Sequence, residues 1–355
     1  MTINTTTQEQ YLDRSLGCLL GGAVGDALGA PVEFASRPQI IRQFGSKGIR
    51  DFVVAYGRVG AITDDTQMTL FTAEGCLRAV ANGFSPGSDE GVAALRRAYL
   101  RWLHTQGVDG YGQVERTGWL IGQRELFSRR APGNTCLSAL QREGGEKNDS
   151  KGCGGIMRVA PCGIVHAGNP GLAYELGLAA AKLTHGHPTG YLSAAVFAAI
   201  IAELILGKSL IDTIHTARAI LVRSPSHEET LAALDAAVHL AKAGTLPEIA
   251  IPKLGEGWIA EEALAISLYC ALTASNLEEG IVTAVNITGD SDSTGAITGN
   301  LLGAMAGAAV IPQRWLVQLE LHDVIEAVAQ DLILLPLADM QHGGADYLRR
   351  YPSFD

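Results

Sequence analysis

The chain has 355 residues, and 47% of them are apolar, which is enough for a large buried core in one domain or in two smaller ones. A charged fraction of 18% is too low for a disordered chain. The net charge of −10 argues against a nucleic-acid backbone or an anionic membrane as a partner, because both carry the same sign of charge.

Cysteine usage and the chain start both indicate a cytoplasmic protein. Six cysteines are scattered without a C-x-x-C pair, which is typical of reduced, mostly buried thiols. The first ten residues, MTINTTTQEQ, have neither a basic start nor an apolar run, so we expect no secretory signal. The longest apolar stretches, 191–206 and 295–311, are short for a bilayer and are interrupted by Glu203 and Asn300. We therefore expect core helices there rather than membrane spans.

Most of the chain is predicted to form one helical domain. Residues 1–11 begin with polar, uncharged side chains, and we expect them to be a flexible N-terminal arm. Residues 12–355 contain no clean linker, so we assign them to a single domain. Helical apolar spacing recurs through this part, whereas 49–55 is a modest strand candidate. We predict a compact, single-domain, all-α fold of roughly a dozen helices.

Glycine follows a regular spacing in two segments near the two ends of the chain. These glycines are Gly17, Gly21, Gly25 and Gly29, and then Gly295, Gly299, Gly303 and Gly307. In a helix this spacing makes one side smooth, although each glycine costs about 1 kcal/mol relative to alanine. The smooth sides indicate very close packing. Two explanations are open: ordinary helix contacts, or an approach of two helices that carry acidic residues.

Two short acidic clusters lie far apart in the chain, and hydroxyl residues flank both. They read Thr63-Asp64-Asp65-Thr66 and Asp290-Ser291-Asp292-Ser293-Thr294. Each precedes a predicted helix, and acids favour helix N-termini, so a helix start explains either cluster alone. Together they favour a metal site, because close carboxylates repel each other unless a cation lies between them. Mg²⁺, Mn²⁺ and Ca²⁺ take oxygen ligands of this kind, and we expect more than one ion.

The segment 106–155 is the most irregular part of the chain, and a long loop of this kind tends to be functional. At its end, 151–158 is a glycine loop entering a helix; its amides suit a phosphate, or they form a plain turn. For His185 we prefer a hydrogen bond to a ligand over an ordinary interhelical role. A P-loop is excluded because Ala202 stands where glycine is required, and neither a G-x-G-x-x-G after a strand nor an H-E-x-x-H occurs.

Taken together, these motifs resemble the ADP-ribosylglycohydrolase family, whose founding type is the dinitrogenase-reductase-activating glycohydrolase. The resemblance extends from Gly17 to about Gly307 and rests on the order and spacing of five blocks. They are GCLLGGAVGDALGAPVEF at 17–34, TDDTQMTL at 63–70, KGCGGIMRVAP at 151–161, LTHGHP at 183–188 and TGDSDSTGAITGNLLGA at 288–304. The resemblance implies an all-α fold with two Mg²⁺ or Mn²⁺ ions at the bottom of an ADP-ribose cleft.

The resemblance also implies the residues of the site. The metal ligands would be Thr63, Asp64, Asp65, Asp290, Asp292 and either Ser293 or Thr294, of which strict spacing favours Ser293. The pyrophosphate would lie on the loop of Gly152, Cys153, Gly154, Gly155 and Ile156, with His185 at the phosphate or ribose. Glu33 would lie near the metals. Cys153 departs from the family pattern, since many relatives carry asparagine or another polar residue there.

The implied reaction is hydrolysis of the bond between ribose C1″ and an acceptor side chain of an ADP-ribosylated protein, with arginine as the preferred acceptor. Cleavage develops oxocarbenium character, and water attacks C1″. A metal orients the ribose hydroxyls and lowers the pKa of a water. Glu33, Asp65 or Asp292 would act as general base or acid, and the choice among them stays open. Ion charge would also let a protein of net charge −10 bind the anionic ADP-ribose.

Two other functions fit the same residues. A binding or neutralising protein would keep the fold without turnover and use the N-terminal arm to dock on a partner, such as a cognate ADP-ribosyltransferase. A metal-dependent nucleotide phosphohydrolase would share the ions but cut P–O bonds. Two intact acidic clusters favour an enzyme over a binding protein. Product analysis separates the two hydrolases, because one releases free ADP-ribose and the other releases AMP and ribose phosphate.

Overall fold

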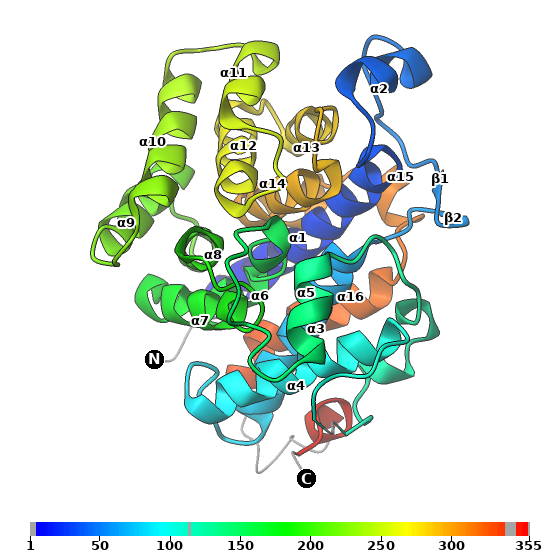
Figure 1. Cartoon of the computed structure of the whole chain (residues 1–355), viewed down its shortest axis with the longest axis vertical. Helices are drawn as coiled ribbons and strands as arrows, with labels where there is room; N and C mark the ends of the chain where they lie inside the picture. Colours follow the sequence, from blue (N-terminus) through cyan, green and yellow to red (C-terminus); the bar gives the residue numbers. More distant parts are fainter. Residues whose placement is uncertain (1–4, 113–114, 338–345, 354–355) are drawn as a thin grey trace.

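Helices dominate the computed structural model, which describes residues 5–112, 115–337 and 346–353. The α-helices are α1 (Thr5–Gly29), α2 (Arg37–Phe44), α3 (Asp64–Ala81), α4 (Asp89–Thr105), α5 (Asn134–Gln141), α6 (Ala160–Val165), α7 (Pro170–Lys182), α8 (Pro188–Leu204), α9 (Leu210–Leu221), α10 (Glu228–Lys242), α11 (Pro247–Leu254), α12 (Ala260–Thr273), α13 (Leu277–Val285), α14 (Ser291–Ala306), α15 (Gln313–Leu316) and α16 (His322–Leu334). Short 3₁₀ helices are η1 (Ala30–Val32), η2 (Leu120–Gly122), η3 (Arg124–Leu126), η4 (Cys153–Gly155), η5 (Ala308–Val310) and η6 (Leu335–Leu337). Strands β1 (Val54–Ala55) and β2 (Arg58–Val59) form one small antiparallel hairpin. The predicted all-α, single-domain fold is confirmed (Figure 1).

Helices α1 and α14 pack antiparallel through their glycine stripes near the middle of the molecule (Figure 1). A Cβ atom built on Gly25 would lie 2.0 Å from the carbonyl oxygen of Gly295, and one on Gly29 would lie 2.4 Å from that of Ser291. Side chains larger than hydrogen therefore do not fit between the two backbones. The stripes bring the end of α1 against the start of α14, where the second acidic cluster lies. The glycine spacing therefore corresponds to the close approach of two helices that carry acidic residues, which was the second explanation considered from the sequence.

The start of the chain differs from the flexible arm predicted for residues 1–11. Helix α1 begins at Thr5, so residues 5–11 are helical, while residues 1–4 lie outside the described part. Tyr11 and Leu12 pack against the hydrophobic core, which holds these polar turns in the helix. By length and composition, residues 7–32 are the one described segment that could cross a membrane, but 89% of its apolar stretch is buried inside the protein.

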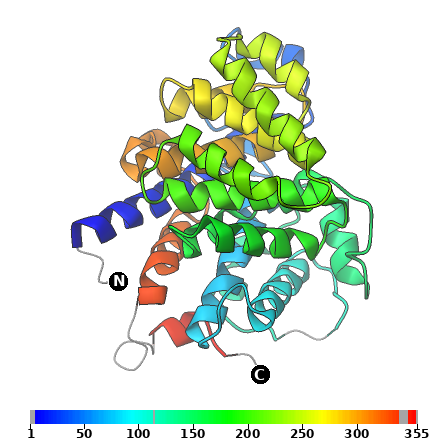
Figure 2. The ribbon, with the colours of Figure 1, turned by 90° about the vertical axis from the view of Figure 1, so that its left-hand side faces the viewer.

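Helix α3 is buried along nearly its whole length, and its first turn faces the place where α1 and α14 meet. Seen from the side, α1 lies between α14 and α16 (Figure 2). The ends of three buried helices therefore converge: the C-terminal end of α1 and the N-terminal ends of α3 and α14. This convergence joins segments from the two ends of the chain around one cavity.

Candidate active site

A cavity of about 600 Å³ opens where these helix ends meet. It is lined by Glu33, Phe34, Asp64, Asp65, Arg129, Ala131, Pro132, Gly133, Asn134, Thr135, Cys136, Gly152, Cys153, Gly154, Met157, His185, Trp258, Asp290, Asp292 and Ser293. Both acidic clusters contribute, as does the irregular segment 106–155 through Arg129 and residues 131–136 and 152–154. The structure thus brings together most of the predicted site residues. Thr63, Gly155 and Ile156 lie behind the lining.

Asp26 of α1 holds the first acidic cluster in place. Its carboxylate accepts hydrogen bonds from the backbone amide of Thr63, at 3.0 and 3.1 Å, and from the amide of Thr66 at 3.1 Å. It also accepts the Thr66 hydroxyl proton. The Thr63 hydroxyl in turn accepts from the Asp65 amide at 3.3 Å and caps α3, as predicted. These contacts fix the first turn of α3, so that Asp64 and Asp65 point at the cavity.

Sequence reasoning missed Asp26. The available signal was an acid within the apolar, glycine-striped segment 17–29, with no basic residue beside it on the helix. A fully buried carboxylate in such a helix requires hydrogen-bond donors from elsewhere in the fold.

The second acidic cluster forms the start of α14 and separates Ser293 from Thr294. Asp290 caps the helix by accepting from the Ser293 amide at 3.3 Å, and Asp292 accepts from the same amide at 3.0 Å. The Ser293 side chain lines the cavity. The hydroxyl of Thr294 instead donates to backbone carbonyls, including that of Asp290 at 2.8 Å. Of the two hydroxyls considered as ligands, only that of Ser293 faces the site.

The cavity concentrates negative charge that the described residues do not neutralise. Five of its lining residues are carboxylic acids, each between 3 and 7% exposed. The buried oxygens Glu33 Oε2 and Asp65 Oδ2 have no hydrogen-bond partner in the described structure. Arg129, the one arginine or lysine among the described lining residues, forms no ion pair with them. Unpartnered carboxylate oxygens around an oxygen-rich cavity are a donor set that fits hard divalent cations.

Burial and mutual repulsion raise the pKa values of these acids. Burial is the largest cause for Glu33, followed by the charges of neighbouring aspartates, and together they raise its pKa to about 10. Burial and then the charge of Asp292 raise the pKa of Asp26 to about 7. The pKa values are also raised, with burial as the largest cause, for Asp64, Asp65, Asp290 and Asp292. A cation between these groups would reverse the shifts by favouring the charged forms.

The tightest cluster of potential metal-binding side chains in the described structure lies elsewhere. His322, Asp323 and Glu326 bring their ligand atoms within 4.8 Å of one another at the start of α16. The Asp323 side chain is fully exposed there, and exposed acids at a helix start are common without an ion. In the cleft, Asp290 and Asp292 lie close enough to interact directly, and the charge of Asp290 adds to burial in raising the pKa of Asp292.

The glycine loop differs in part from the predicted phosphate cradle. The Ile156 amide donates to the Cys153 carbonyl at 2.9 Å, and the Cys153 amide donates to the Trp258 carbonyl at 3.1 Å. These two amides are therefore occupied, because the loop closes into η4 and bridges to the segment before α12. The Ile156 side chain is wholly buried. Gly152 and Gly154 line the cavity, and the Gly152 amide donates to the Ser150 hydroxyl at 3.3 Å.

His185 lies under this loop and is 1% exposed. Burial and then the Arg158 charge lower its pKa to about 3, so the ring is neutral near pH 7. Its Nδ1 lies 2.8 Å from the Thr184 hydroxyl, which accepts from Arg158 at 2.7 Å. The Thr184 hydroxyl has two acceptors within reach, Nδ1 and the Ala181 carbonyl at 3.4 Å, and when it donates to Nδ1 the ring proton is on Nε2. Nε2 is the nitrogen that faces Gly152 and Gly154 and hence the cavity.

An aromatic pair at the cavity was not predicted from the sequence. The rings of Phe34 and Trp258 stack at 5.9 Å between centroids with an interplanar angle of 15°. Phe34 is 75% exposed and Trp258 is 38% exposed. Phe34 could have been noticed as the neighbour of Glu33, whereas nothing in the sequence marks Trp258. Exposed stacked rings next to a cleft offer a flat surface for a planar ligand group.

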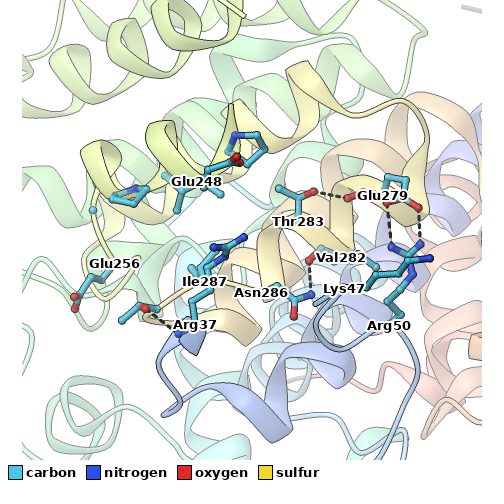
Figure 3. A pocket seen from close by; sticks show the side chains of 15 residues that line it. Arg37, Lys47, Arg50, Glu248, Glu256, Glu279, Val282, Thr283, Asn286 and Ile287 are labelled. Atoms are coloured by element: carbon cyan, nitrogen blue, oxygen red, sulfur yellow. Dashed lines mark hydrogen bonds and ion pairs between the residues drawn. The ribbon is translucent and has the colours of Figure 1, made fainter. Parts of the chain in front are cut away.

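A second cavity of about 900 Å³ lies between α2, α11 and α13 (Figure 3). Its lining mixes the bases Arg37, Lys47 and Arg50 with acids, of which Glu279 pairs with Arg50. It is larger than the acid-lined cavity, but none of the predicted site residues reaches it. We place the chemistry in the smaller cavity, because both acidic clusters and the unpartnered oxygens of Glu33 and Asp65 are there.

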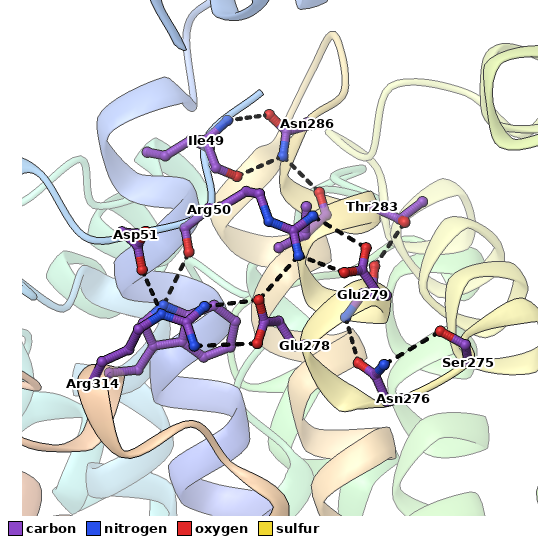
Figure 4. A network of polar contacts seen from close by, with 12 residues as sticks. Ile49, Arg50, Asp51, Ser275, Asn276, Glu278, Glu279, Thr283, Asn286 and Arg314 are labelled. Atoms are coloured by element: carbon purple, nitrogen blue, oxygen red, sulfur yellow. Dashed lines mark hydrogen bonds and ion pairs between the residues drawn. The ribbon is translucent and has the colours of Figure 1, made fainter. Parts of the chain in front are cut away.

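A surface network next to this second cavity joins α13 and α15 to the segment before β1 (Figure 4). Glu278 accepts from Arg50 at 3.0 Å and from Arg314 at 2.8 Å. Arg314 also pairs with Asp51 at 2.6 Å, and the Trp315 indole donates to the Arg50 carbonyl at 3.1 Å. The network is partly exposed, and its ion pairs join α13, α15 and the segment before β1 rather than the cleft acids.

The helical fold and the two acidic clusters around one cleft place this chain in a class of glycosidic-bond hydrolases. It is a member of the ADP-ribosylglycohydrolase family, which it matches over residues 7–342. It is 27% identical to the ADP-ribosyl-[dinitrogen reductase] glycohydrolase of Rhodospirillum rubrum, covering 92% of this chain and 97% of that protein. It is 25% identical to the ADP-ribosylarginine hydrolase Tri1 of Pseudomonas putida, covering 92% and 80%. A solved structure described as an ADP-ribosylglycohydrolase-related protein complex superposes with a TM-score of 0.67 at 27% identity, covering 92% of this chain and 99% of that one.

Proposed function

We propose that this protein is a divalent-metal-dependent hydrolase that removes ADP-ribose from modified protein side chains, with arginine as the acceptor. The observation that carries the proposal is the cavity with five buried carboxylic acids, two of which have an oxygen without a partner in the described structure. Family membership supports the glycosidic bond as the target. Similarity to proteins named for dinitrogen reductase and for ADP-ribosylarginine supports a modified protein and an arginine linkage.

Two Mg²⁺ ions, or Mn²⁺, are the proposed cofactors. The residues that would hold them are Asp64, Asp65, Asp290, Asp292 and Ser293, with Thr63 directly beneath. When bound, such ions supply positive charge that offsets the carboxylates, orient ribose hydroxyls and activate water. Asp26 would hold Asp64 and Asp65 in position, because it fixes the start of α3 by accepting from the Thr63 and Thr66 amides.

The remaining residues are proposed to bind ADP-ribose and to move a proton. His185 would donate its Nε2 proton to a phosphate or ribose oxygen, beside the backbone of Gly152 and Gly154. The carboxyl group of Glu33 faces the acids with its free Oε2, so this oxygen is placed to take a proton from the water that attacks C1″. The buried charges of Asp65 and Asp292 would stabilise the oxocarbenium-like transition state. The stacked rings of Phe34 and Trp258 would pack on a planar group at the cleft.

The direct test is incubation of the purified protein with an arginine-linked ADP-ribosylated peptide, followed by mass spectrometry. We expect free ADP-ribose and unmodified peptide in Mg²⁺ or Mn²⁺, and no product in EDTA. Asp64→Asn combined with Asp292→Asn should abolish release, while Glu278→Gln, in the surface network, should leave it unchanged. Activity that persists in EDTA or in the double variant would refute the metal mechanism.

The same samples separate the other functions. AMP and ribose phosphate would identify a phosphohydrolase instead. Binding of ADP-ribose without any turnover, in Mg²⁺ and in Mn²⁺, would identify a binding protein. A parallel serine-linked peptide tests the linkage, and release from that peptide alone would overturn the arginine assignment.

A further inference from the structure

Cys153 places a thiol among the oxygen donors of the cleft. It begins η4, and its Sγ donates to Asp290 Oδ2 at 2.8 Å, while the Ser293 hydroxyl donates to the same sulfur at 3.7 Å. Both partners belong to the second acidic cluster, more than a hundred residues away in the chain. Cys136 also lines the cavity, but its sulfur faces the Gly154 carbonyl and the Arg158 guanidinium rather than the acids.

A second, independent feature at this place points to a cation. Asp65 is 3% exposed, and its buried Oδ2 has no partner in the described structure although it lines the same cavity as Cys153. The charge of Asp65 also helps to raise the pKa of the Cys153 thiol, after the larger effects of burial and of Asp290. Sulfur, carboxylate and hydroxyl donors of three different segments therefore face one space.

We propose that Cys153 is a sulfur ligand, so that this cleft binds a thiophilic divalent cation such as Zn²⁺, Co²⁺ or Cd²⁺ beside Asp290 and Ser293, in competition with Mg²⁺. The inference rests on the ion site proposed above. Mg²⁺ takes oxygen ligands and gains nothing from the sulfur, whereas the borderline and soft ions accept nitrogen, oxygen and sulfur together. The thiol therefore sets which ion this protein prefers and makes it sensitive to traces of thiophilic metal.

The distances from the Cys153 sulfur to the Asp290 and Ser293 oxygens suit such an ion. Bond lengths of about 2.3 Å to sulfur and about 2.1 Å to oxygen put tetrahedral donors about 3.6 Å apart. The sulfur lies 2.8 Å from Asp290 Oδ2 and 3.7 Å from Ser293 Oγ, so a small movement of the Asp290 side chain is enough. Coordination replaces the S–H bond by a metal–sulfur bond, and the released proton passes to the buffer. Nothing is oxidised or reduced.

The test is spectroscopic and needs no substrate. The purified, metal-free protein is titrated with Co²⁺, and the sulfur-to-Co²⁺ charge-transfer absorption in the near ultraviolet is recorded, with bound Co²⁺ measured by equilibrium dialysis. We expect the band in the wild type and in the matched control Cys136→Ser, and its loss in Cys153→Ser. The same Cys153→Ser change should weaken Co²⁺ and Cd²⁺ binding at least about tenfold, with Mg²⁺ binding changed much less.

A second readout uses the unaltered protein. Cd²⁺ should protect Cys153 from alkylation, as read by peptide mass spectrometry, whereas Mg²⁺ should protect it far less. Absence of the Co²⁺ band in the wild type, its persistence in Cys153→Ser, or equal protection by Mg²⁺ and Cd²⁺ would each overturn the proposal. Failure of the proposed hydrolysis is distinguishable, because a protein that shows the band and releases no ADP-ribose contradicts only the assigned function.

Discussion

The carboxylate of Asp26 accepts both the backbone amide and the hydroxyl of Thr66, and so joins α1 to the first turn of α3. The same carboxylate accepts the Thr63 amide. The position of the first acidic cluster therefore depends on a residue 37 positions earlier in the chain. Because Asp64 and Asp65 follow Thr63 directly, this buried contact also fixes where their backbone lies.

Replacing Asp26 should destabilise the protein more than removing one of its partners. Asp26→Ala leaves the Thr63 and Thr66 amides and the Thr66 hydroxyl without an acceptor, and we expect a loss of about 3 kcal/mol or more in the free energy of unfolding. Thr66→Val removes only the hydroxyl and should cost about 1 kcal/mol. Urea unfolding in Mg²⁺ measures both. Equal stability of Asp26→Ala and wild type would contradict the anchoring role.

The contact between α1 and α14 should reject even a methyl group. In Gly25→Ala the new Cβ would lie 2.0 Å from the Gly295 carbonyl oxygen, so the helices must separate. We expect a net loss of about 2–3 kcal/mol in the free energy of unfolding, although alanine favours a helix by about 1 kcal/mol. Gly87→Ala is the control, because nothing lies within 4 Å of its Cβ position. A Gly25→Ala protein as stable as this control would mean that the stripes tolerate side chains.

The metal-free protein should lose stability as the pH rises. The folded-state pKa of Asp26 is raised to about 7, above the unfolded value of about 3.9. A carboxyl group whose folded pKa is raised contributes its stability fully below the unfolded pKa and loses it as the pH rises through the folded pKa. The loss from this group therefore falls between about pH 4 and pH 7, with a slope of up to about 1.4 kcal/mol per pH unit. Glu33, with a pKa raised to about 10, extends the trend above neutral pH.

Urea unfolding in EDTA, at intervals between about pH 5 and pH 8, checks this trend. Mg²⁺ should flatten the slope, because an ion between the acids lowers their pKa values. Asp292→Asn should flatten it as well, since the Asp292 charge raises the pKa of both Asp26 and Glu33. A slope in EDTA that matches the slope in Mg²⁺ would show that no ion neutralises these groups.

Buried and exposed ion pairs should differ sharply in their effect on stability. Glu320 is 1% exposed and accepts from Arg130 at 2.9 Å and from the Ile62 amide at 3.1 Å, next to the first acidic cluster. Glu320→Ala leaves the Arg130 charge buried without this partner and should cost about 3–5 kcal/mol. Glu278→Ala removes partly exposed pairs of the surface network and should cost about 1 kcal/mol or less. Thermal unfolding of the two variants side by side tests the contrast, and similar losses would contradict it.

Several features of this protein followed from the sequence because their signals are local. Apolar spacing within a helix predicted the all-α fold, and the four-residue spacing of glycine predicted the smooth sides of α1 and α14. Thr63 was predicted as a helix cap, because a cap needs only the amides of the next turn. The two acidic clusters predicted the cleft, because carboxylates that lie close together repel each other unless a cation lies between them.

Tertiary structure alone decided which residues share the cleft and how they are oriented. Residues 5–11 are helical because Tyr11 and Leu12 meet the core, a contact that polar composition does not reveal. Ser293 faces the acids while the Thr294 hydroxyl turns to backbone carbonyls, since one helical step of about 100° separates neighbours on α14. Cys153 meets Asp290 across 137 positions. Contacts at such separations depend on how whole helices pack, and no local spacing encodes them.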